Sequence, residues 1–357
     1  MSQKAVLLCN LGSPLSPEPK YVRRYLRQFL MDGFVIDIPR LPRWLLVHLI
    51  IAPFRSYASA EAYQSIWSEK GSPLIQHTRL LTEKLQSELE GWQVAYAMRY
   101  GEPSMESVLQ SLVEKGVQQI DLIPLYPQYA KSSTGTVLYE AQQVLQALGY
   151  KGQVQSVRDF FQSTPFIEAY AKNLRDDVQE FQPEKTLFSF HGLPERHVKQ
   201  TDKTGQHCLE KKDCCAQIQE VNRYCYRAQC FATARSLARH IQLPEENYRV
   251  CFQSRLGKQP WIQPYTDHVI TELAEKGVKR ILVACPSFVA DCLETLEEIA
   301  IRAKEQFIEE GGEDLKMVAS LNSSRPWVKA LSEMLEGEQF DFHPLGEIAP
   351  KEEGLAL

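Results

Sequence analysis

The stretch EKGVQQIDLIPLYPQY (114–129) reads like the stretch EKGVKRILVACPSFVAD (275–291). Each leaves a helical pattern at a glycine, passes through an apolar run and breaks at a proline. An apolar run of this length between a helix end and a turn is typical of a buried strand. The chain therefore contains a repeated helix–strand unit.

The neighbouring segments repeat in the same order. AVLLCNLGSP (5–14) is matched by TLFSFHGLPE (186–195), and VAYAMRYGEP (94–103) is matched by YRVCFQSRLGKQP (248–260). Strands that alternate with helical patterns predict parallel sheets flanked by helices. We therefore expect an α/β fold with two similar Rossmann-like domains, whose ligands lie at the carboxyl ends of the strands.

The repeat also sets the domain boundaries. We expect a first domain at 1–155 with a hydrophobic lip at about 41–54, and a second at 156–320 with a cysteine-rich insertion at about 205–230. Residues 321–357 should form a C-terminal helix and a tail that pack back on the first domain. The other helices are expected at 15–31, 74–90, 104–115, 136–148, 165–181, 230–241, 264–276 and 291–310.

Charge and composition exclude some classes of function. The 357 residues carry a net charge of −5, which argues against a nucleic-acid partner. The phosphate-binding patterns GxGxxG and GxxxxGK[ST] are absent from the sequence, which counts against a nucleotide enzyme. The apolar run before Gly12 is too short for a signal peptide, so we expect a cytoplasmic protein with reduced thiols.

The apolar stretch LPRWLLVHLIIAPF (41–54) allows two interpretations. It is too short to cross a bilayer and is apolar nearly all round. It forms either a buried core helix or a hydrophobic lip that touches a membrane surface or a large apolar ligand.

His191 in SFHGLPE follows an apolar strand directly, at the expected ligand-binding edge. A histidine here can simply cap a turn, or it can act as a general base or metal ligand. In DCLETLEE (291–298), a helix would place Asp291, Glu294 and Glu298 on one face. These acids either form a solvent-exposed face at the N-terminus of a helix, or they form a row that accepts protons or binds a divalent cation.

Taken together, six motifs give the chain a family resemblance over nearly its whole length. The chain resembles ferrochelatase, the lyase that inserts Fe²⁺ into protoporphyrin IX to form protohaem in the last step of haem biosynthesis. The matching motifs are NLGSP (10–14), RYGEP (99–103), PLYPQYAKSSTGT (124–136), SFHGLPERH (189–197), FQSRLGKQPWIQPYTD (252–267) and CPSFVADCLETLEEI (285–299).

The resemblance implies roles for particular residues. His191 and Glu294 match the catalytic pair that meets Fe²⁺, and Asp291 and Glu298 match an acidic path beside it. Cys292 stands where many members carry His, which puts metal binding at that position in doubt. The porphyrin-pocket positions correspond to Tyr63, Ser72, Arg99, Tyr100, Tyr129 and Trp261.

Five of the nine cysteines lie in CLEKKDCCAQIQEVNRYCYRAQC (208–230). The resemblance to members with an internal cysteine-rich segment implies a [2Fe–2S] cluster on four of Cys208, Cys214, Cys215, Cys225 and Cys230. Zinc and unligated thiols stay open, although no C-x₂-C pair is present. We expect any centre to be structural or sensing, separate from metal insertion.

Several functions stay open at this stage. The partners expected are protoporphyrin IX and ferrous iron, with peripheral membrane contact through the lip. The alternatives are a coproporphyrin III ferrochelatase, a cobalt chelatase, or a non-catalytic tetrapyrrole-binding or iron–sulfur sensor protein. The sequence does not define the oligomeric state.

Overall fold

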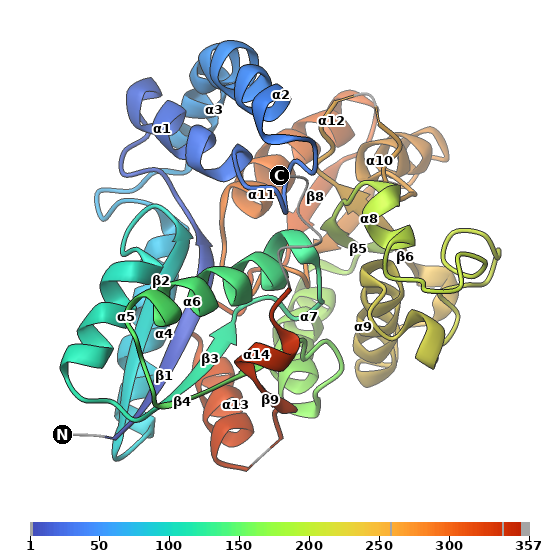
Figure 1. Cartoon of the computed structure of the whole chain (residues 1–357). Coiled ribbons are helices and arrows are strands. Elements are labelled where there is room, and N and C mark those ends of the chain that lie inside the picture. The colour runs from blue at the N-terminus through green and yellow to red at the C-terminus, as the bar shows by residue number, and fades with distance from the viewer. Residues whose placement is uncertain (1–2, 258, 338, 351–357) are drawn as a thin grey trace. The chain divides into compact units, whose positions relative to one another are not determined.

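The structure of the chain is a computed structural model (Figure 1). It describes residues 3–257, 259–337 and 339–350. The chain divides into two compact units. Within the described residues, unit 1 comprises those up to 126, 130–159 and those from 332 onward, and unit 2 comprises 127–129 and 160–331.

Unit 1 is built on a five-stranded sheet in the order β2-β1-β3-β4-β9. Four strands run parallel, and the short β9 pairs antiparallel with β4 at the edge. The strands are β1 (Lys4–Gly12), β2 (Trp92–Tyr100), β3 (Gln119–Pro124), β4 (Gln153–Val157) and β9 (Phe342–Pro344).

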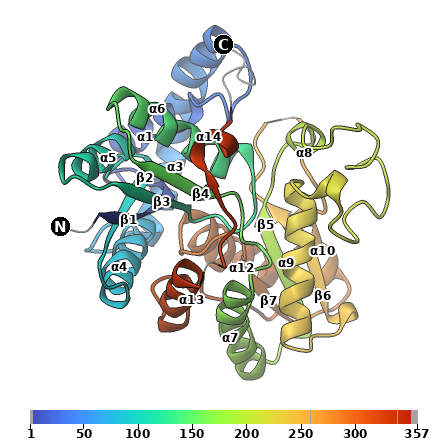
Figure 2. The ribbon, with the colours of Figure 1, turned by 60° about the horizontal axis from the view of Figure 1, so that its bottom comes forward.

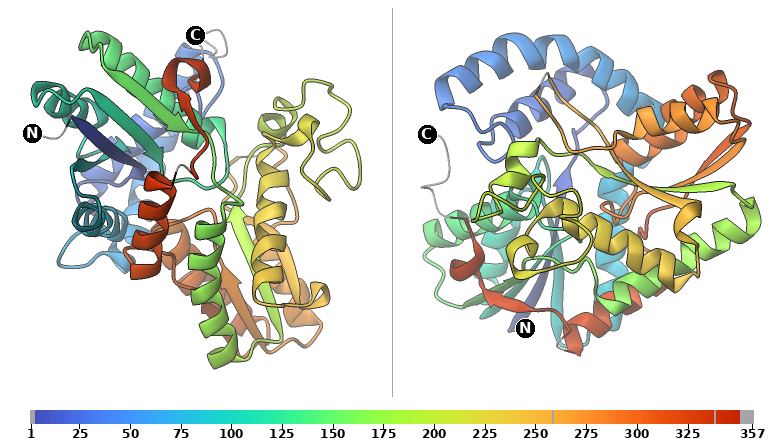
Figure 3. Two further views of the ribbon diagram at one scale, coloured as in Figure 1. Left: turned by 90° about the horizontal axis from the view of Figure 1, so that it is seen from below. Right: turned by 90° about the vertical axis from the view of Figure 1, so that its right-hand side faces the viewer.

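Helices cover both faces of this sheet, as Figures 2 and 3 show. Alternate residues of β1, Ala5, Leu7 and Cys9, pack with α5 (Met105–Glu114) and α6 (Thr136–Ala147). Since successive strand side chains point to opposite faces, Val6 and Leu8 face the side that α4 (Pro73–Glu88) covers.

Unit 2 repeats this arrangement with the strand order β6-β5-β7-β8, all parallel. Helices α10 and α12 share one core with the sheet, and α7 and α9 lie side by side on the other face (Figure 2). The elements are β5 (Lys185–His191), β6 (Tyr248–Gln253), β7 (Arg280–Ala284), β8 (Asp314–Met317), α7 (Thr164–Phe181), α9 (Tyr226–His240), α10 (Thr266–Glu275) and α12 (Lys304–Glu309).

The two units therefore share one topology, in which the first strand is flanked by the second and the third. In such sheets the strand order reverses beside the first strand, and ligands bind outside the carboxyl ends of the strands there. The expected α/β class with Rossmann-like sheets is confirmed, with the antiparallel β9 as an unpredicted addition.

The remaining elements connect or extend these layers. Helices α1 to α3 form a group inserted between β1 and α4, and α8 leads into the cysteine-rich segment. They are α1 (Pro19–Leu30), α2 (Arg40–Leu45), η1 (Leu46–Ile51), α3 (Ala52–Ile66), η2 (Lys131–Gly135), α8 (Glu195–Lys199), η3 (Glu220–Asn222), η4 (Glu245–Asn247), α11 (Leu293–Leu296), η5 (Glu298–Ala303), α13 (Arg325–Glu336) and α14 (Leu345–Ile348).

Two regions differ from the sequence-based expectation. The single helix expected at 291–310 is broken into α11, the π-helical η5 and α12. The tail after residue 336, which has little periodicity, forms β9 and α14, while its residues 351–357 lie outside the described part. Both elements are too short to leave a periodic signal in the sequence.

Candidate active site

His191 ends β5, and its backbone is held from two other elements. Its N–H donates to Ser287 Oγ after β7 (3.3 Å), and its carbonyl accepts a hydrogen bond from the Tyr226 hydroxyl of α9 (2.9 Å). The imidazole is half-buried, with its ring centre 6.3 Å from that of Phe288. The side chain is therefore fixed in place at the edge where ligands of such sheets bind.

The ring orientation of His191 defines its chemistry. Nδ1 lies 2.6 Å from the carbonyl oxygen of Gly192. A carbonyl oxygen can only accept, so Nδ1 carries the hydrogen. In the neutral ring Nε2 is then unprotonated, and its lone pair can take a proton or bind a metal ion. This arrangement suits a general base.

Gly192 allows three segments to meet beside His191. A Cβ atom at this position would lie 2.9 Å from the Gln253 carbonyl oxygen and 3.3 Å from Cε3 of Trp261. The indole of Trp261 is oriented by a hydrogen bond from Nε1 to the Leu256 carbonyl (3.0 Å). Trp261, predicted as a pocket residue, therefore lies next to the His191 segment.

Glu294 lies on the short helix α11, which begins after Cys292 at its N-cap. Its carbonyl accepts a hydrogen bond from Gln253 Nε2 (2.6 Å). The thiol of Cys292 is buried against the Glu294 carboxylate, and its pKa is raised by burial first and by that carboxylate second. Cys292 thus stays a neutral thiol beside the acid.

Asp291 and Glu298 are tied to the protein by hydrogen bonds. The Asp291 carboxylate accepts from Asn322 Nδ2 (2.7 Å) and from the Ser320 N–H (3.2 Å). Glu298 accepts from the N–H (2.9 Å) and the hydroxyl of Ser254. These bonds hold both carboxylates in defined positions around α11.

Gln253 is a site residue that the motif comparison did not single out. It pairs with His191 across β5 and β6, and its Oε1 accepts from the Ser189 hydroxyl (2.6 Å) while Nε2 holds Glu294. Gln253 is 4% exposed, so the hydrogen bonds of its side-chain amide are sheltered from water. Its position at the end of a strand in FQSRLG was the available signal.

The predicted pocket residues Arg99 and Tyr100 belong to unit 1, where both contact Asp32. Arg99 Nη2 and the Tyr100 hydroxyl each donate to Asp32 Oδ2 at 2.7 Å, and the Thr136 hydroxyl donates at 2.5 Å. The Arg99 and Asp32 side chains are 12% and 5% exposed. This buried ion pair fastens the turn after α1 to the end of β2.

The other predicted pocket residues are divided between the units. Tyr63 of α3 is buried with its ring edge-on to Tyr25 (6.4 Å), and Ser72 is buried at the N-cap of α4, both in unit 1. Tyr129 belongs to unit 2, where its N–H donates to Gln229 Oε1 (2.7 Å).

The candidate site of unit 2 lies around the ends of β5, β6 and β7. Its predicted residues are His191, Glu294, Asp291, Glu298 and Trp261.

Comparisons with known proteins place the chain in a family. A family model described as Ferrochelatase matches residues 3–339. A ferrochelatase of Pseudomonas fluorescens (strain SBW25) is 47% identical, over 94% of this chain and 98% of its own length. One of Coxiella burnetii (strain Dugway 5J108-111) is 46% identical over 92% of each chain.

The chain belongs to the ferrochelatase family.

Solved structures agree with the fold. SirB from Bacillus subtilis with Fe³⁺ matches with a TM-score of 0.53 at 11% identity, over 96% of this chain and all of that one. A sirohydrochlorin chelatase SirB from Bacillus subtilis subspecies spizizenii in complex with cobalt matches with a TM-score of 0.51 at 12% identity, over the same shares of the two chains. These likenesses identify a chelatase-type α/β fold in this ferrochelatase-family chain.

The cysteine-rich segment forms a long irregular loop between α8 and α9 (Figure 3). All five of its thiols are buried. The sulfurs of Cys214 and Cys215 lie 3.7 Å apart. The thiols of Cys215 and Cys225 contact each other, and a hydrogen bond between Cys225 and Cys208 raises the pKa of Cys225 to about 12. Four thiols are therefore neighbours in the order 208, 225, 215, 214.

Polar side chains, two of them buried and one half-buried, fix the backbone around these thiols. Asp202 Oδ2 accepts from the N–H of Cys208 (2.9 Å). Asn222 Nδ2 and Arg235 Nη1 donate to the carbonyls of Cys214 (2.8 Å) and Cys215 (2.9 Å). The loop has little regular secondary structure. Its backbone is held instead by these side-chain hydrogen bonds, each of which anchors one cysteine.

The stretch 41–54 is exposed in the structure rather than a buried core helix. Its largest exposed side chains include Leu41, Leu49, Ile50 and Phe54, which are 70%, 57%, 56% and 76% exposed. We call α2, η1 and the first turn of α3 the lip. Within the described residues, no helix combines the length and the apolar character that spanning a membrane requires.

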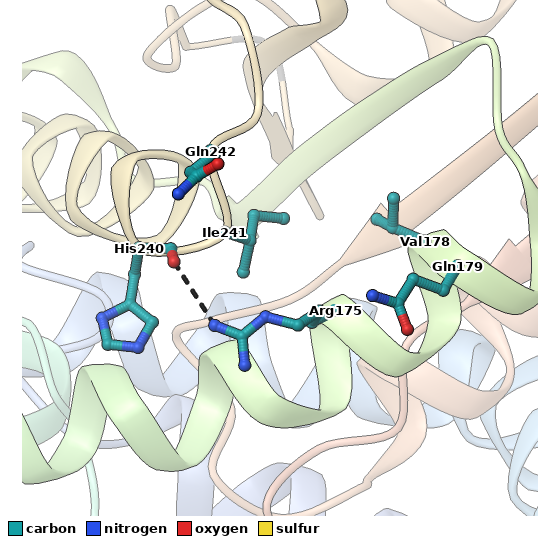
Figure 4. Close-up of a pocket in the computed structure, with 6 residues that line it drawn as sticks. All are labelled: Arg175, Val178, Gln179, His240, Ile241 and Gln242. Carbon is teal, nitrogen blue, oxygen red and sulfur yellow. Dashed lines mark hydrogen bonds between the residues drawn. The ribbon is translucent and has the colours of Figure 1, made fainter.

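A surface pocket of about 420 Å³ lies between α7 and the C-terminal end of α9 (Figure 4). Arg175 crosses it with a hydrogen bond to the His240 carbonyl (3.3 Å). The pocket is at the opposite end of α9 from Tyr226, the residue that holds His191. It therefore takes no part in the candidate site.

We predict that Asp32→Ala destabilises unit 1 by about 3–5 kcal/mol, because the Arg99 guanidinium loses the nearer and more buried of its two carboxylate partners, Glu140 at 3.6 Å being the other. Urea unfolding of the purified variant measures this change. Glu83→Ala is the matched control, since it removes the exposed Arg79–Glu83 pair and should cost no more than about 1 kcal/mol. Equal losses in the two variants would show that the Asp32 contacts add nothing.

Proposed function

We propose that this protein is a ferrochelatase that inserts Fe²⁺ into protoporphyrin IX to form protohaem, the last step of haem biosynthesis. Family membership over nearly the whole chain supports this function, together with the His191–Glu294 arrangement at the end of the unit 2 sheet. The expected partners are the porphyrin and ferrous iron.

His191 is the base in this reaction. A free porphyrin carries two pyrrole N–H protons, which must leave as the divalent metal enters. The hydrogen bond from Nδ1 to the Gly192 carbonyl keeps the Nε2 lone pair available to accept these protons. This contact is the single observation that carries the assignment.

Glu294 provides the second reacting group. A carboxylate at the same edge of the sheet as the base can pass the released protons to water or guide a hard divalent cation toward the ring. Gln253 holds the Glu294 backbone, while Asp291 and Glu298 are fixed around the same helix. We propose that the three acids form a path for protons or iron that begins at Glu294.

We further propose a [2Fe–2S] cluster on Cys208, Cys214, Cys215 and Cys225. The four are buried neighbours, and Arg227 Nη1 lies 3.1 Å from the Cys215 sulfur, where a cation favours the thiolate form. Cys230 is the spare thiol, since its side chain pairs with Tyr226 inside unit 2.

The thiol arrangement suits a two-iron group. The four thiols lie as two neighbouring pairs, Cys208 with Cys225 and Cys214 with Cys215. A [2Fe–2S] centre divides four thiolates between two irons, so it needs pairs of neighbouring sulfurs such as Cys214 and Cys215. The centre would supply structure or redox sensing, and metal insertion remains with His191 and Glu294.

We also propose that the protein is cytoplasmic and that the lip binds the surface of a membrane. Its apolar side chains project outward, and the exposed Arg40 and Arg55 flank them. Apolar side chains with basic neighbours suit the interface of a membrane that contains anionic lipids.

Anaerobic assays that follow the loss of porphyrin fluorescence test the enzyme assignment. We expect turnover of protoporphyrin IX with Fe²⁺, and a drop of about 10²–10⁴-fold in His191→Ala, as is usual when a general base is removed. Glu294→Gln should also be impaired, while His240→Ala, on the far end of α9, should match the wild type.

Parallel assays separate the alternatives. Faster turnover of coproporphyrin III or of Co²⁺ would reassign the substrate. If the folded wild type is inactive with every combination of porphyrin and metal ion, the protein is a binding or sensor protein instead. If His191→Ala is fully active, His191 is not the base.

The cluster is tested by the visible absorption of protein purified without oxygen. We expect a coloured wild type whose iron and sulfide are lost when Cys208, Cys214, Cys215 or Cys225 is replaced by Ser, because each is one of four ligands. Cys230→Ser should stay coloured. The cluster is refuted if the triple variant Cys208→Ser, Cys215→Ser, Cys225→Ser keeps its visible absorption. A colourless wild type that contains bound zinc would show a zinc site in place of the cluster.

Vesicle flotation tests the lip. Leu49→Ser with Phe54→Ser should weaken binding to vesicles that contain phosphatidylserine by about tenfold or more, because two large apolar side chains are lost from the contact. Ile308→Ser, which removes a 45% exposed apolar residue of unit 2, is the control. An unchanged vesicle affinity with a raised KM for porphyrin would show that the lip serves the substrate instead.

A further inference from the structure

Asn322 lies in the turn between β8 and α13 and has a left-handed backbone, with a φ of 52°. Side chains other than glycine seldom adopt this conformation, although Asn tolerates it better than most. Two other left-handed residues, Gln182 and Gln242, follow the ends of α7 and α9, where such a conformation is common. Asn322 ends no helix, so its surroundings must hold the backbone in this conformation.

Three hydrogen bonds of Asn322 reach the segment that precedes α11. Its N–H donates to the Val289 carbonyl (2.7 Å), and its Oδ1 accepts from the N–H of Asp291 (2.8 Å). Since a backbone N–H can only donate, Oδ1 faces it and Nδ2 faces the carboxylate, where it donates to Asp291 Oδ2 (2.7 Å). The amide therefore binds both the backbone and the side chain of one residue.

Asp291 is held on its other side as well. The carboxylate is buried, and its Oδ1 accepts from the Thr295 hydroxyl (3.1 Å) and from the Ser320 N–H (3.2 Å). A hydrogen bond to an ionised carboxylate is stronger than one between neutral groups, so the bond from Asn322 Nδ2 is a substantial part of this anchoring. Asp291 is thus fixed between the turn after β8 and α11.

The position of Asp291 decides where α11 begins. Asp291 comes directly before the N-cap Cys292, and Glu294 is the second residue of the helix. Helix α11 has four residues and passes into the π-helical η5, so few hydrogen bonds of its own hold it in place.

Two side-chain amides therefore hold α11 from outside. Gln253 Nε2 binds the Glu294 carbonyl (2.6 Å), and Asn322 binds Asp291, three residues earlier. Gln253 comes from the end of β6, whereas Asn322 comes from the turn after β8. Without Asn322, only the contact on the β6 side would remain of these two.

We propose that Asn322 is a positioning residue for Glu294, which it holds in place through Asp291 and the start of α11. When its amide is removed, the segment before α11 is released from the turn and Glu294 is no longer held at the edge of the sheet. Because these acids are the proposed path for iron or protons, the loss should affect the use of Fe²⁺ rather than the binding of porphyrin. This inference rests on the proposed function of Glu294.

Anaerobic kinetics of the wild type, Asn322→Gly and Gln182→Gly test the proposal. Glycine accepts the left-handed backbone, so each variant removes an amide side chain without straining the chain. We expect kcat/KM for Fe²⁺ to fall by about tenfold or more in Asn322→Gly, the worth of one hydrogen bond to a charged group. KM for protoporphyrin IX should stay within about twofold of the wild-type value.

Gln182→Gly is the matched control. The Gln182 side chain is exposed at the end of α7 and donates to the Gln179 carbonyl (2.8 Å), so its loss should leave both kinetic constants unchanged. Equal kcat/KM for Fe²⁺ in the two variants would overturn the positioning role, as would an equal loss for iron and porphyrin. A wild type that is inactive with both substrates would instead overturn the proposed function, and this inference with it.

Hydrogen exchange tests the contact without turnover. The Asp291 amide should be protected in the wild type, because its partner is the Asn322 side chain. It should exchange about tenfold faster or more in Asn322→Gly, while the amides of β6 keep their wild-type rates. An unprotected Asp291 amide in the wild type would overturn the proposal, even if Asn322→Gly failed to fold.

Discussion

The parallel pairing of β5 between β6 and β7 is the constraint on which the candidate active site depends. It places the ends of three strands at one edge, so His191, Gln253 and the segment that leads to Glu294 come together although they lie far apart in the chain. The close approach of these ends leaves no room for a side chain at Gly192. The strand order thus determines which side chains lie close enough together to form the candidate site.

Unit 1 has the same strand order but uses the equivalent edge differently. There Gly12, with a positive φ of 107°, lies against the end of β2, since a Cβ would be 1.7 Å from the Tyr100 carbonyl oxygen. Beside it the buried Arg99–Asp32 pair joins the helical insertion to the sheet. Unit 2 therefore carries His191 and Glu294, and unit 1 carries the exposed lip and the Arg99–Asp32 pair.

The sequence was sufficient for the fold class and for the family, because both depend on strongly patterned motifs at strand ends. It could not show that Arg99 and Tyr100 meet Asp32, which is 67 and 68 residues away and lies in no motif. The interruption between α11 and η5 was also not predictable, because a π-helical segment leaves no distinct periodic signature. Individual contacts of Gln253 and Tyr226 depend on tertiary packing and need coordinates.

The antiparallel edge strand β9 has a consequence for biosynthesis. It completes the sheet of unit 1 by pairing with β4, yet it follows all of unit 2 in the chain. A ribosome must therefore finish the contiguous stretch from 160 to 331 before the first sheet can acquire its last strand. Unit 1 is therefore the first unit whose synthesis begins and the last whose sheet is completed.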